Sequence, residues 1–349
     1  MKVLIVSNCR PNSGWGTYTE NLRCAVGDSV RIVNLFGASG EERCPGAPAL
    51  VKDEAKVRSL LARSMPRLFF RGLVRDFSRE RKEGLMVHFA YNLLPDLGDR
   101  NTDIVTIHDV LFMGQYDDSP RMERIYKRRL LKSYLNYDHI LTVSDSTRQH
   151  LLSMGCRGDI EVIHPPCPPG FSRVDVTDDM RKQLNLPSDK TLILSASNVK
   201  PWKNLAMVER VMKRLGDKYM LLRIGPGIGQ GMTFTNIDTA TLNLLYNASD
   251  LLLFPSLDEG FGFPIVEAMK TGLPAVVSDI DVFHELASDA AEYVDPTDAD
   301  SIVEGIHTAI GHSEQLKEAG IRRSVLFDQK IFREKMNRYY QMVAGETIR

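Results

Sequence analysis

The sequence predicts an α/β protein built from two open, mostly parallel sheets, each in a domain of its own. Short apolar runs rich in β-branched residues alternate with helical stretches, which is the pattern of parallel strands joined by crossover helices. A proline cluster interrupts this alternation near the middle of the chain, and the alternation resumes after it. The length of 349 residues also exceeds what one hydrophobic core usually spans.

The first domain opens with a strand in KVLIVS, a continuous β-branched run of the kind that is buried on both faces of a sheet. A glycine loop follows, and we expect a helix to begin at about Thr17. Further strands are expected in VRIVNLF, LMVHFAY, DIVTIHDV, HILTVS and EVIHPP. We place this domain at residues 1–164.

The boundary between the domains is expected at HPPCPPGFS, residues 164–172, because four prolines in nine residues cannot continue a strand or a helix. The second domain is placed at residues 165–330, with strands expected in LILSAS, YMLLRIG, LLLFPS, PAVVSD and AEYVD. The last run, IFREKMNRYYQMV, predicts a helix. We expect this helix, at residues 331–349, to pack back onto the first domain.

Composition and charge exclude several classes of protein. The net charge is -1, made of +4 over residues 1–165 and -5 over the remainder, which does not suggest a nucleic-acid-binding protein. The five cysteines are an odd number without a CxxC pair, so they indicate neither a disulfide framework nor a zinc site and fit the reducing cytoplasm. No apolar run approaches the ~18 residues of a membrane span, and the short N-terminal run is interpreted as a strand.

Candidate ligand-binding residues follow the predicted strands, since ligands of open α/β sheets bind beyond the carboxyl ends of the strands. Gly14 and Gly16 follow the first strand, and the unpaired amides of the next helix start favour an anion. A tight turn without a ligand is the alternative there. His108 follows DIVTI and could contact a sugar hydroxyl, or it could be a structural histidine held by Asp109.

A lysine-containing loop follows LILSAS in the second domain. Lys200 and Lys203 stand in NVKPWKN, and fixed positive charge at a strand end can hold a phosphate. Two lysines that face solvent are the alternative, although Trp202 between them favours a covered loop.

Two glutamates lie in DEGFGFPIVEAMKTG, residues 258–272. A glycine turn, a proline suited to a first helical position and a closing glycine predict a short helix here. Glu259 then lies in the loop and Glu267 lies one turn inside the helix. The amides near Gly262 and Phe263 would offer positive potential to a diphosphate. A loop carboxylate and a solvated helix face are the alternatives for each glutamate taken singly.

At these residues the sequence resembles the retaining glycosyltransferases of family 4, which have the GT-B fold. EGFGFPIVEAMKTGLPAVVSD carries two glutamates separated by seven residues, and NVKPWKNL is similar to the family's phosphate-binding lysine segment. SGWGTYTENL resembles its first glycine loop, and TIHD, ILTVSDSTRQHL and LLYNASDLLLFPSLDEGFG match further landmarks. The resemblance covers nearly the whole chain and is looser from residue 37 to residue 100. It implies two Rossmann-like domains facing each other across a cleft.

The resemblance also implies roles for the residues of the second domain. Glu267 would bond the ribose hydroxyls of a nucleotide sugar, and Lys203 would bind its diphosphate. Glu259 would contact hydroxyls of the donor sugar, with the amides of Gly262 and Phe263 beside the sugar and phosphates.

The first domain would complete this site, as the resemblance implies. The amides at Gly14 and Gly16 would finish the phosphate cradle, and His108 would lie near the transferring sugar. One departure is Asn198, where many relatives have an arginine, and Lys200 is the candidate for supplying the missing charge.

The expected function is the retaining transfer of a sugar from GDP-mannose or a UDP-sugar to a lipid-linked or oligosaccharide acceptor. Charge that grows on the leaving diphosphate must be stabilised, and a lysine with two helix N-termini can do this without a metal. We therefore expect no cofactor and no metal, and we expect the catalytic residues to be Glu259, His108 and Lys203. A GT-B-like sugar-nucleotide epimerase and a non-catalytic nucleotide-sugar-binding protein are the alternatives.

A basic segment in the first domain suggests a further partner. Arginines recur at every fourth position of residues 63–82, namely Arg63, Arg67, Arg71, Arg75 and Arg79. On a helix they would form one stripe beside apolar neighbours, a pattern suited to an anionic membrane surface. A second basic cluster lies at residues 121–132. The expected location is the cytoplasm, peripheral on the inner face of the membrane, and a solvated helix face is the alternative.

Overall fold

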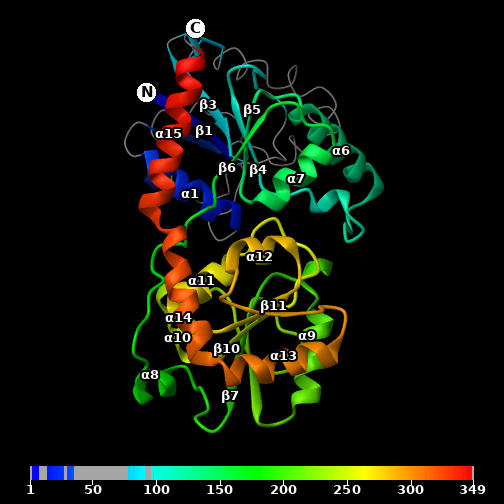
Figure 1. Ribbon diagram of the computed structural model, residues 1–349, viewed down its shortest axis with the longest axis vertical. Helices are drawn as coiled ribbons and strands as arrows, with labels where there is room; N and C mark the ends of the chain where they lie inside the picture. Colours follow the sequence, from blue (N-terminus) through cyan, green and yellow to red (C-terminus); the bar gives the residue numbers. More distant parts are fainter. Residues whose placement is uncertain are drawn as a thin grey trace. The chain divides into compact units, whose positions relative to one another are not determined.

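The computed structural model describes residues 2–7, 14–26, 30–34, 78–79, 81–82, 84–90, 96 and 98–347. The chain divides into two compact units. Unit 1 is Met1–Pro166 together with Gln329–Arg349, and unit 2 is Cys167–Asp328. Figure 1 shows the elements of both units in sequence colours.

Unit 1 contains a six-stranded sheet in the order β2-β1-β3-β4-β5-β6, in which every neighbouring pair is parallel. The strands are β1 (Lys2–Ser7), β2 (Val30–Asn34), β3 (Leu85–Phe89), β4 (Ile104–Ile107), β5 (His139–Thr142) and β6 (Asp159–Val162). The first five lie in runs that the sequence predicts, whereas β6 begins two residues before the predicted run EVIHPP and overlaps it only at Glu161 and Val162. Buried apolar side chains of β1, β3, β4 and β5 contribute to the core of the unit, where each fully buried Val, Leu or Ile contributes roughly 1.5–3 kcal/mol.

The helices of unit 1 lie on both sides of these strands. They are α1 (Gly14–Val26), α6 (Arg121–Tyr134), α7 (Asp145–Ser153) and α15 (Gln329–Thr347), with a short 3-10 turn, η2 (Leu111–Met113). In Figure 1, α1 and α15 lie together on one side, and α6 and α7 lie on the other. The prediction that the first helix begins at about Thr17 is wrong, because α1 begins at Gly14.

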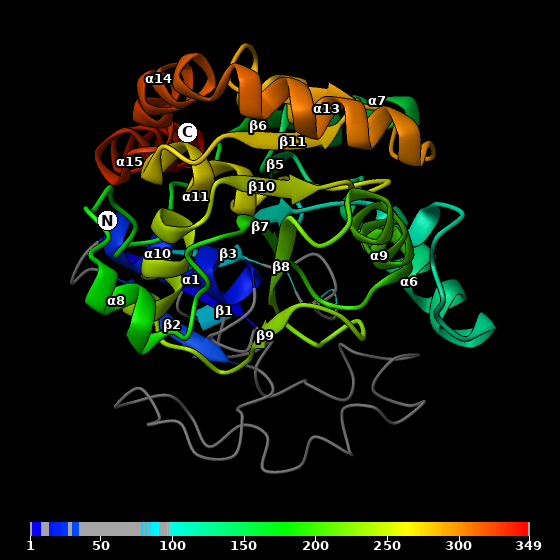
Figure 2. The same ribbon diagram turned by 90° about the horizontal axis from the view of Figure 1, so that it is seen from below.

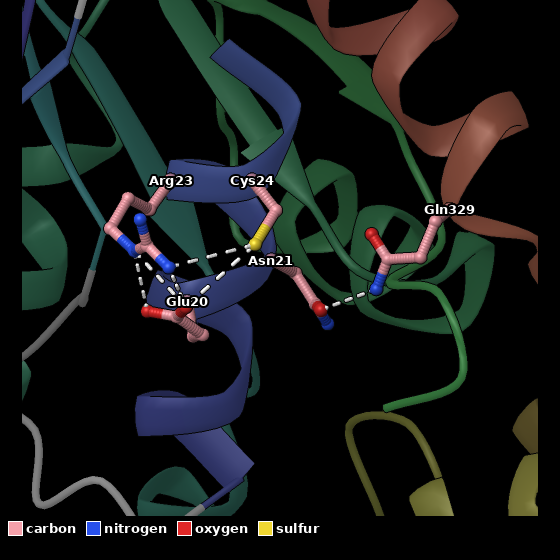
Figure 3. A network of polar contacts seen from close by, with 5 residues as sticks. All are labelled: Glu20, Asn21, Arg23, Cys24 and Gln329. Atoms are coloured by element: carbon pink, nitrogen blue, oxygen red, sulfur yellow. Dashed lines mark hydrogen bonds and ion pairs between the residues drawn. The ribbon is translucent and has the colours of Figure 1, made fainter. Parts of the chain in front are cut away.

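The first residues of the C-terminal helix α15 contact α1. Gln329 Nε2 donates to Asn21 Oδ1 at 2.7 Å, as Figure 3 shows beside the Glu20–Arg23 ion pair of the same helix. Phe332 then packs edge-on against Tyr18, with 6.1 Å between ring centroids. The last helix of the sequence is therefore part of the same core as the first.

Unit 2 contains a second six-stranded parallel sheet, in the order β12-β11-β10-β7-β8-β9. The strands are β7 (Thr191–Ala196), β8 (Tyr219–Ile224), β9 (Met232–Phe234), β10 (Leu251–Phe254), β11 (Ala275–Ser278) and β12 (Glu292–Val294). Figure 2 shows β11, β10, β7, β8 and β9 in this order. The sequence pattern does not predict β9, whose three residues are too few to show a periodicity.

The helices of unit 2 connect these strands. They are α8 (Asp178–Gln183), α9 (Leu205–Leu215), α10 (Thr239–Ala248), α11 (Phe263–Thr271), α12 (Asp281–Ala287), α13 (Ala299–Gly311) and α14 (Ser313–Ser324), with 3-10 turns η3 (Pro201–Lys203) and η4 (Val325–Phe327). Since β7 and β10 are neighbours, the loops that leave their carboxyl ends lie at the same edge of the sheet. None of the helices described here has the length and apolar character needed to cross a membrane.

Candidate active site

The amino end of α11 is shaped by a glycine. Gly262 is the N-cap and has a φ of +157°, a backbone conformation that residues with a side chain rarely adopt. A Cβ at this position would also lie 3.2 Å from Leu286 Cδ1. The first backbone hydrogen bonds to its carbonyl come from the amides of Ile265 and Val266. The amides of Gly262 and Phe263 precede this turn, at the positive end of the helix dipole. Gly272, at a φ of +73°, ends the helix as the sequence predicts.

Lys203 and Glu259 are in contact beyond the carboxyl ends of β7 and β10. Lys203 ends η3 in the loop after β7, Glu259 lies in the loop after β10, and Lys203 Nζ donates to Glu259 Oε1. Only 14% of the lysine side chain and 10% of the glutamate side chain are exposed. Lys203 Nζ also lies 5.3 Å from the ring centroid of Phe254. Breaking so well covered a pair would leave one charge without its partner, which is strongly destabilising.

Asn204 joins these two loops, and it was not among the predicted site residues. Its backbone is left-handed, with φ 56° and ψ 36°, a conformation that asparagine tolerates better than most residues. Its Nδ2 donates to Pro255 O at 3.0 Å and to Pro296 O at 2.8 Å. The amide of Leu257 adds a hydrogen bond to Trp202 O at 2.7 Å. In sequence, an asparagine before a helix suggests an N-cap, which is why this role was missed.

Glu267 is placed differently from Glu259, inside α11 and half-buried. The fully buried Tyr246 of α10 donates its hydroxyl hydrogen to Glu267 Oε2 at 2.6 Å. Burial raises the pKa of Glu267 to about 7, and the hydrogen bond from Tyr246 opposes this rise in part. The carboxyl group therefore titrates near neutral pH. Tyr246 was not predicted as a site residue, since a tyrosine within an apolar helix suggests only a core position.

His108 follows β4 in unit 1 and is buried. Its Nε2–H donates to Ala90 O at 2.8 Å, so the neutral ring carries its lone pair on Nδ1. Tyr18 packs edge-on against the ring at 4.7 Å between centroids, and burial lowers the pKa of His108 to about 4. The ring is thus neutral at pH 7. A backbone carbonyl holds the ring, and Asp109 Oδ1 accepts from the amide of Leu111 at 3.2 Å.

The remaining predicted residues lie in a helix start and an exposed loop. Gly14 and Gly16 are in the first turn of α1 rather than in a loop before it. Asn198 is exposed and its Oδ1 accepts from the amide of Lys200 at 3.2 Å. Lys200 is also exposed, with Nζ 5.8 Å from the ring centroid of Trp202. Lys203 of the same loop is paired with the site carboxylate of Glu259.

The groups that could bind an anion beyond the carboxyl ends of β7 and β10 are the Lys203 ammonium group and the backbone amides at the amino end of α11, and Lys203 contacts the Glu259 carboxylate. Over the described ranges, no group of three or more His, Cys, Asp and Glu side chains is placed to hold a metal ion. A cation next to a helix amino end is an arrangement that binds phosphate.

Proteins of known identity are similar to this chain in sequence. The model of the family described as glycosyl transferases group 1 matches residues 176–323. The O-antigen chain mannosyltransferase RfbU of Salmonella typhimurium is 30% identical over 258 residues, which are 69% of this chain and 68% of that protein. The chain belongs to the group 1 glycosyl transferases. It is a glycosyltransferase, as the sequence predicts, and its relatives indicate sugar transfer in glycan biosynthesis.

Solved structures share the fold of this glycosyltransferase. Sucrose-phosphate synthase from Thermosynechococcus elongatus is similar with a TM-score of 0.79 at 18% identity, covering 99% of this chain and 100% of that one. Anabaena HepE, solved in complex with UDP and glucose, has a TM-score of 0.74 at 15% identity, covering 98% and 100%. The predicted GT-B fold is confirmed by these likenesses.

Proposed function

We propose that this glycosyltransferase takes a nucleoside-diphosphate sugar as donor, retains its anomeric configuration and needs no metal ion. The observation that carries the proposal is the ion pair of Lys203 and Glu259. It joins the loops after two neighbouring strands, and Glu259 stands three positions before the N-cap Gly262 of α11. A cation, a helix amino end and a carboxylate are thus close enough to act on one small ligand.

In this proposal the bound nucleotide sugar breaks the ion pair, and Lys203 and Glu259 each take a part of the ligand as their new partner. The diphosphate takes Lys203 as its counter-ion and lies against the amides of Gly262 and Phe263. Glu259 is then free to accept hydrogen bonds from hydroxyls of the donor sugar. Negative charge that develops on the leaving diphosphate meets a fixed positive charge in a site that is mostly covered, which is where such stabilisation acts most strongly.

Glu267 is proposed to bind the ribose of the nucleotide. An ionised carboxylate accepts hydrogen bonds from two vicinal hydroxyls, whereas a protonated carboxyl has lost part of that capacity. Because the pKa of Glu267 is raised to about 7, ribose binding should be strongest above neutral pH. Since Tyr246 donates to Oε2, we propose that Oε1 is the oxygen that faces the ribose.

We propose that His108 contacts the transferring sugar through its Nδ1 lone pair, because Nε2–H is already bound to Ala90 O. The amides of Gly14 and Gly16, at the amino end of α1, would bind the phosphates. Retention follows from attack of the acceptor on the face from which the diphosphate leaves, without a covalent intermediate on the protein.

Mannose is the first donor sugar to test, because the relative RfbU of Salmonella typhimurium is named a mannosyltransferase. The experiment incubates the protein with GDP-mannose or UDP-glucose, a panel of oligosaccharide and lipid-linked acceptors, and EDTA. Nuclear magnetic resonance of the product then reports the anomeric configuration of the new bond. A retained configuration with undiminished turnover in EDTA is expected. An inverted product contradicts retention, loss of turnover in EDTA contradicts metal independence, and no transfer from either donor contradicts the proposal.

We propose that the acceptor is bound to a membrane, because the exposed face of α6 is basic. Its exposed cations are Arg121, Arg124, Arg128, Arg129 and Lys132, and Met122 beside them is 65% exposed. Of the arginine stripe predicted upstream, Arg79 is exposed and the other four arginines lie outside the described residues. We expect vesicles containing about 30% anionic lipid to retain the protein at low salt, since polybasic segments gain roughly 1 kcal/mol per cation at such a surface. Equal retention by neutral vesicles would contradict this.

A further inference from the structure

Arg223 in β8 is a buried cation without an acidic partner. It is fully buried, and it is the largest of the fully buried side chains in the described part of the chain. It forms no ion pair with any carboxylate among the described residues, and burial alone lowers the pKa of Arg223 to about 10. The guanidinium therefore stays charged at neutral pH. A buried charge is costly unless it is compensated, so its position needs a physical reason.

The guanidinium binds backbone carbonyls at the carboxyl ends of two neighbouring strands. Nη1 donates to Ser195 O at 2.9 Å and to Ile224 O at 2.7 Å, and Nη2 donates to Ser197 O at 2.5 Å. Carbonyl oxygens at this edge would repel an anion. Because Arg223 binds three of these oxygens, their negative ends are compensated, and this end of the sheet gains one unit of positive charge.

The backbone and side chains around the guanidinium are closely packed. Gly225, at a φ of +115°, lies so near the carbonyl of Ser197 that a Cβ on this glycine would stand 2.3 Å from Ser197 O. Arg223 Nε and Ser197 Oγ are both buried and have no hydrogen-bond partner within the described residues. The backbone leads from Ser197 directly into the loop of Lys200 and Lys203. The charge thus lies beneath the start of the loop in which we place the diphosphate.

We propose that Arg223 is an electrostatic positioning residue for the phosphate groups of the donor. It strengthens phosphate binding from below the loop at residues 197–203 without touching the ligand. The inference rests on the proposed function, because it requires the diphosphate to bind at that loop. A charge that is already dehydrated loses no water when the anion binds, and it acts through a medium less polarisable than water.

Two substitutions separate the charge of Arg223 from its hydrogen bonds. Arg223→Gln removes the charge and keeps amide donors for the carbonyls, whereas Arg223→Lys keeps the charge and loses the planar fork. Calorimetry would measure the affinity of wild type and both variants for uridine, UMP and UDP and for guanosine, GMP and GDP. Thermal unfolding of each variant reports folding separately.

The preference for diphosphate over nucleoside is the decisive quantity. We expect Arg223→Gln to reduce this preference about tenfold, with a smaller reduction for the monophosphate, because the effect scales with ligand charge. Arg223→Lys should keep it within about threefold of wild type, as expected if charge rather than geometry matters. Equal weakening of nucleoside, monophosphate and diphosphate by Arg223→Gln would show a purely structural role and overturn the inference.

Two further outcomes are decided in the same experiment. If Arg223→Gln does not fold, the lysine variant decides: a retained phosphate preference supports the inference, and a lost preference contradicts it. If wild-type protein binds none of the six compounds, the proposed function fails, and the inference fails with it. Wild-type binding with equal affinity for nucleoside and diphosphate would contradict both the inference and the proposed diphosphate site. A wild-type preference for diphosphate that Arg223→Gln leaves unchanged would overturn the inference alone.

Discussion

Glu259 and Glu267 lie eight positions apart in one strand–loop–helix segment, and their surroundings are opposite in kind. Glu259 is paired with the full positive charge of Lys203, across loops that leave neighbouring strands. Glu267 accepts a hydrogen bond from the neutral hydroxyl of Tyr246, and burial raises its pKa to about 7. The same residue type is therefore one half of an ion pair in one place and a titrating group in the other. The spacing of the motif alone does not separate these two roles.

The largest effect is expected at the cation that distinguishes Glu259 from Glu267. Lys203→Met should lower kcat by about 10²–10³-fold, because the leaving diphosphate loses its counter-ion. Lys200→Met is the matched control, since Lys200 is exposed and stacks over Trp202, and it should change kcat by less than about threefold. Steady-state kinetics with saturating donor measures both. Similar losses in the two variants would show that Lys203 has no special role.

Glu259→Ala should lower kcat by roughly ten- to a hundredfold while the Kd of the nucleoside diphosphate changes little. The physical reason is that Glu259 contacts the sugar in the proposed site, and the free nucleotide has no such sugar. Removing this carboxylate also frees Lys203 from its partner, so diphosphate affinity should not fall. Kinetics and calorimetry on the same preparation test the split. A loss of nucleotide affinity as large as the loss of kcat would contradict the assigned role.

Glu267→Ala should affect binding more than turnover, the opposite of Glu259→Ala. We expect nucleotide affinity to fall about tenfold and kcat at saturating donor to fall less. The expected loss corresponds to one or two charge-assisted hydrogen bonds to the ribose. The comparison is sharpened with the 2′,3′-dideoxynucleotide, which wild type and Glu267→Ala should bind equally. If the variant discriminates against the dideoxy compound as strongly as wild type does, Glu267 does not bind the ribose.

The elements of this site were predictable from the sequence to the extent that local signals encode them. The bounds of α11 follow from its proline and its glycines, and Gly272 ends the helix where expected. The glycines of α1 were misleading, because their low helix propensity suggested a loop and yet the helix begins at Gly14. A first turn tolerates glycine, since its amides make no intrahelical bond.

The partners within the site were not predictable, because they depend on which strands become neighbours. Lys203 meets Glu259 only because β7 lies beside β10 in the sheet, although the two residues are 56 positions apart. The bonds of Asn204 to Pro255 O and Pro296 O likewise join three separate loops. The charge of Arg223 gave no signal either, since an arginine in an apolar strand suggests an edge position rather than a buried one.

The smallest predicted effect concerns the Tyr246 hydroxyl group, which donates a hydrogen bond to Glu267. A hydrogen bond donated to a carboxylate favours its ionised form, so Tyr246 holds the pKa of Glu267 below the value that burial alone would give. Wild-type nucleotide affinity should increase as pH rises through about 7. Tyr246→Phe should move the midpoint of this increase to higher pH by about one unit, with affinity at high pH nearly unchanged.

Unfolding provides an independent check on the sign of this prediction. A carboxyl group whose folded-state pKa is raised stabilises the fold while protonated, and this contribution is lost as pH rises through the folded-state pKa. For Glu267, the free energy of unfolding should therefore fall between pH 4.5 and about 7, by at most about 3 kcal/mol. Glu267→Gln removes the titrating group and should remove that fall, whereas Tyr246→Phe should extend it to higher pH. A midpoint that moves to lower pH in Tyr246→Phe would mean that the tyrosine hydroxyl does not donate to the carboxylate.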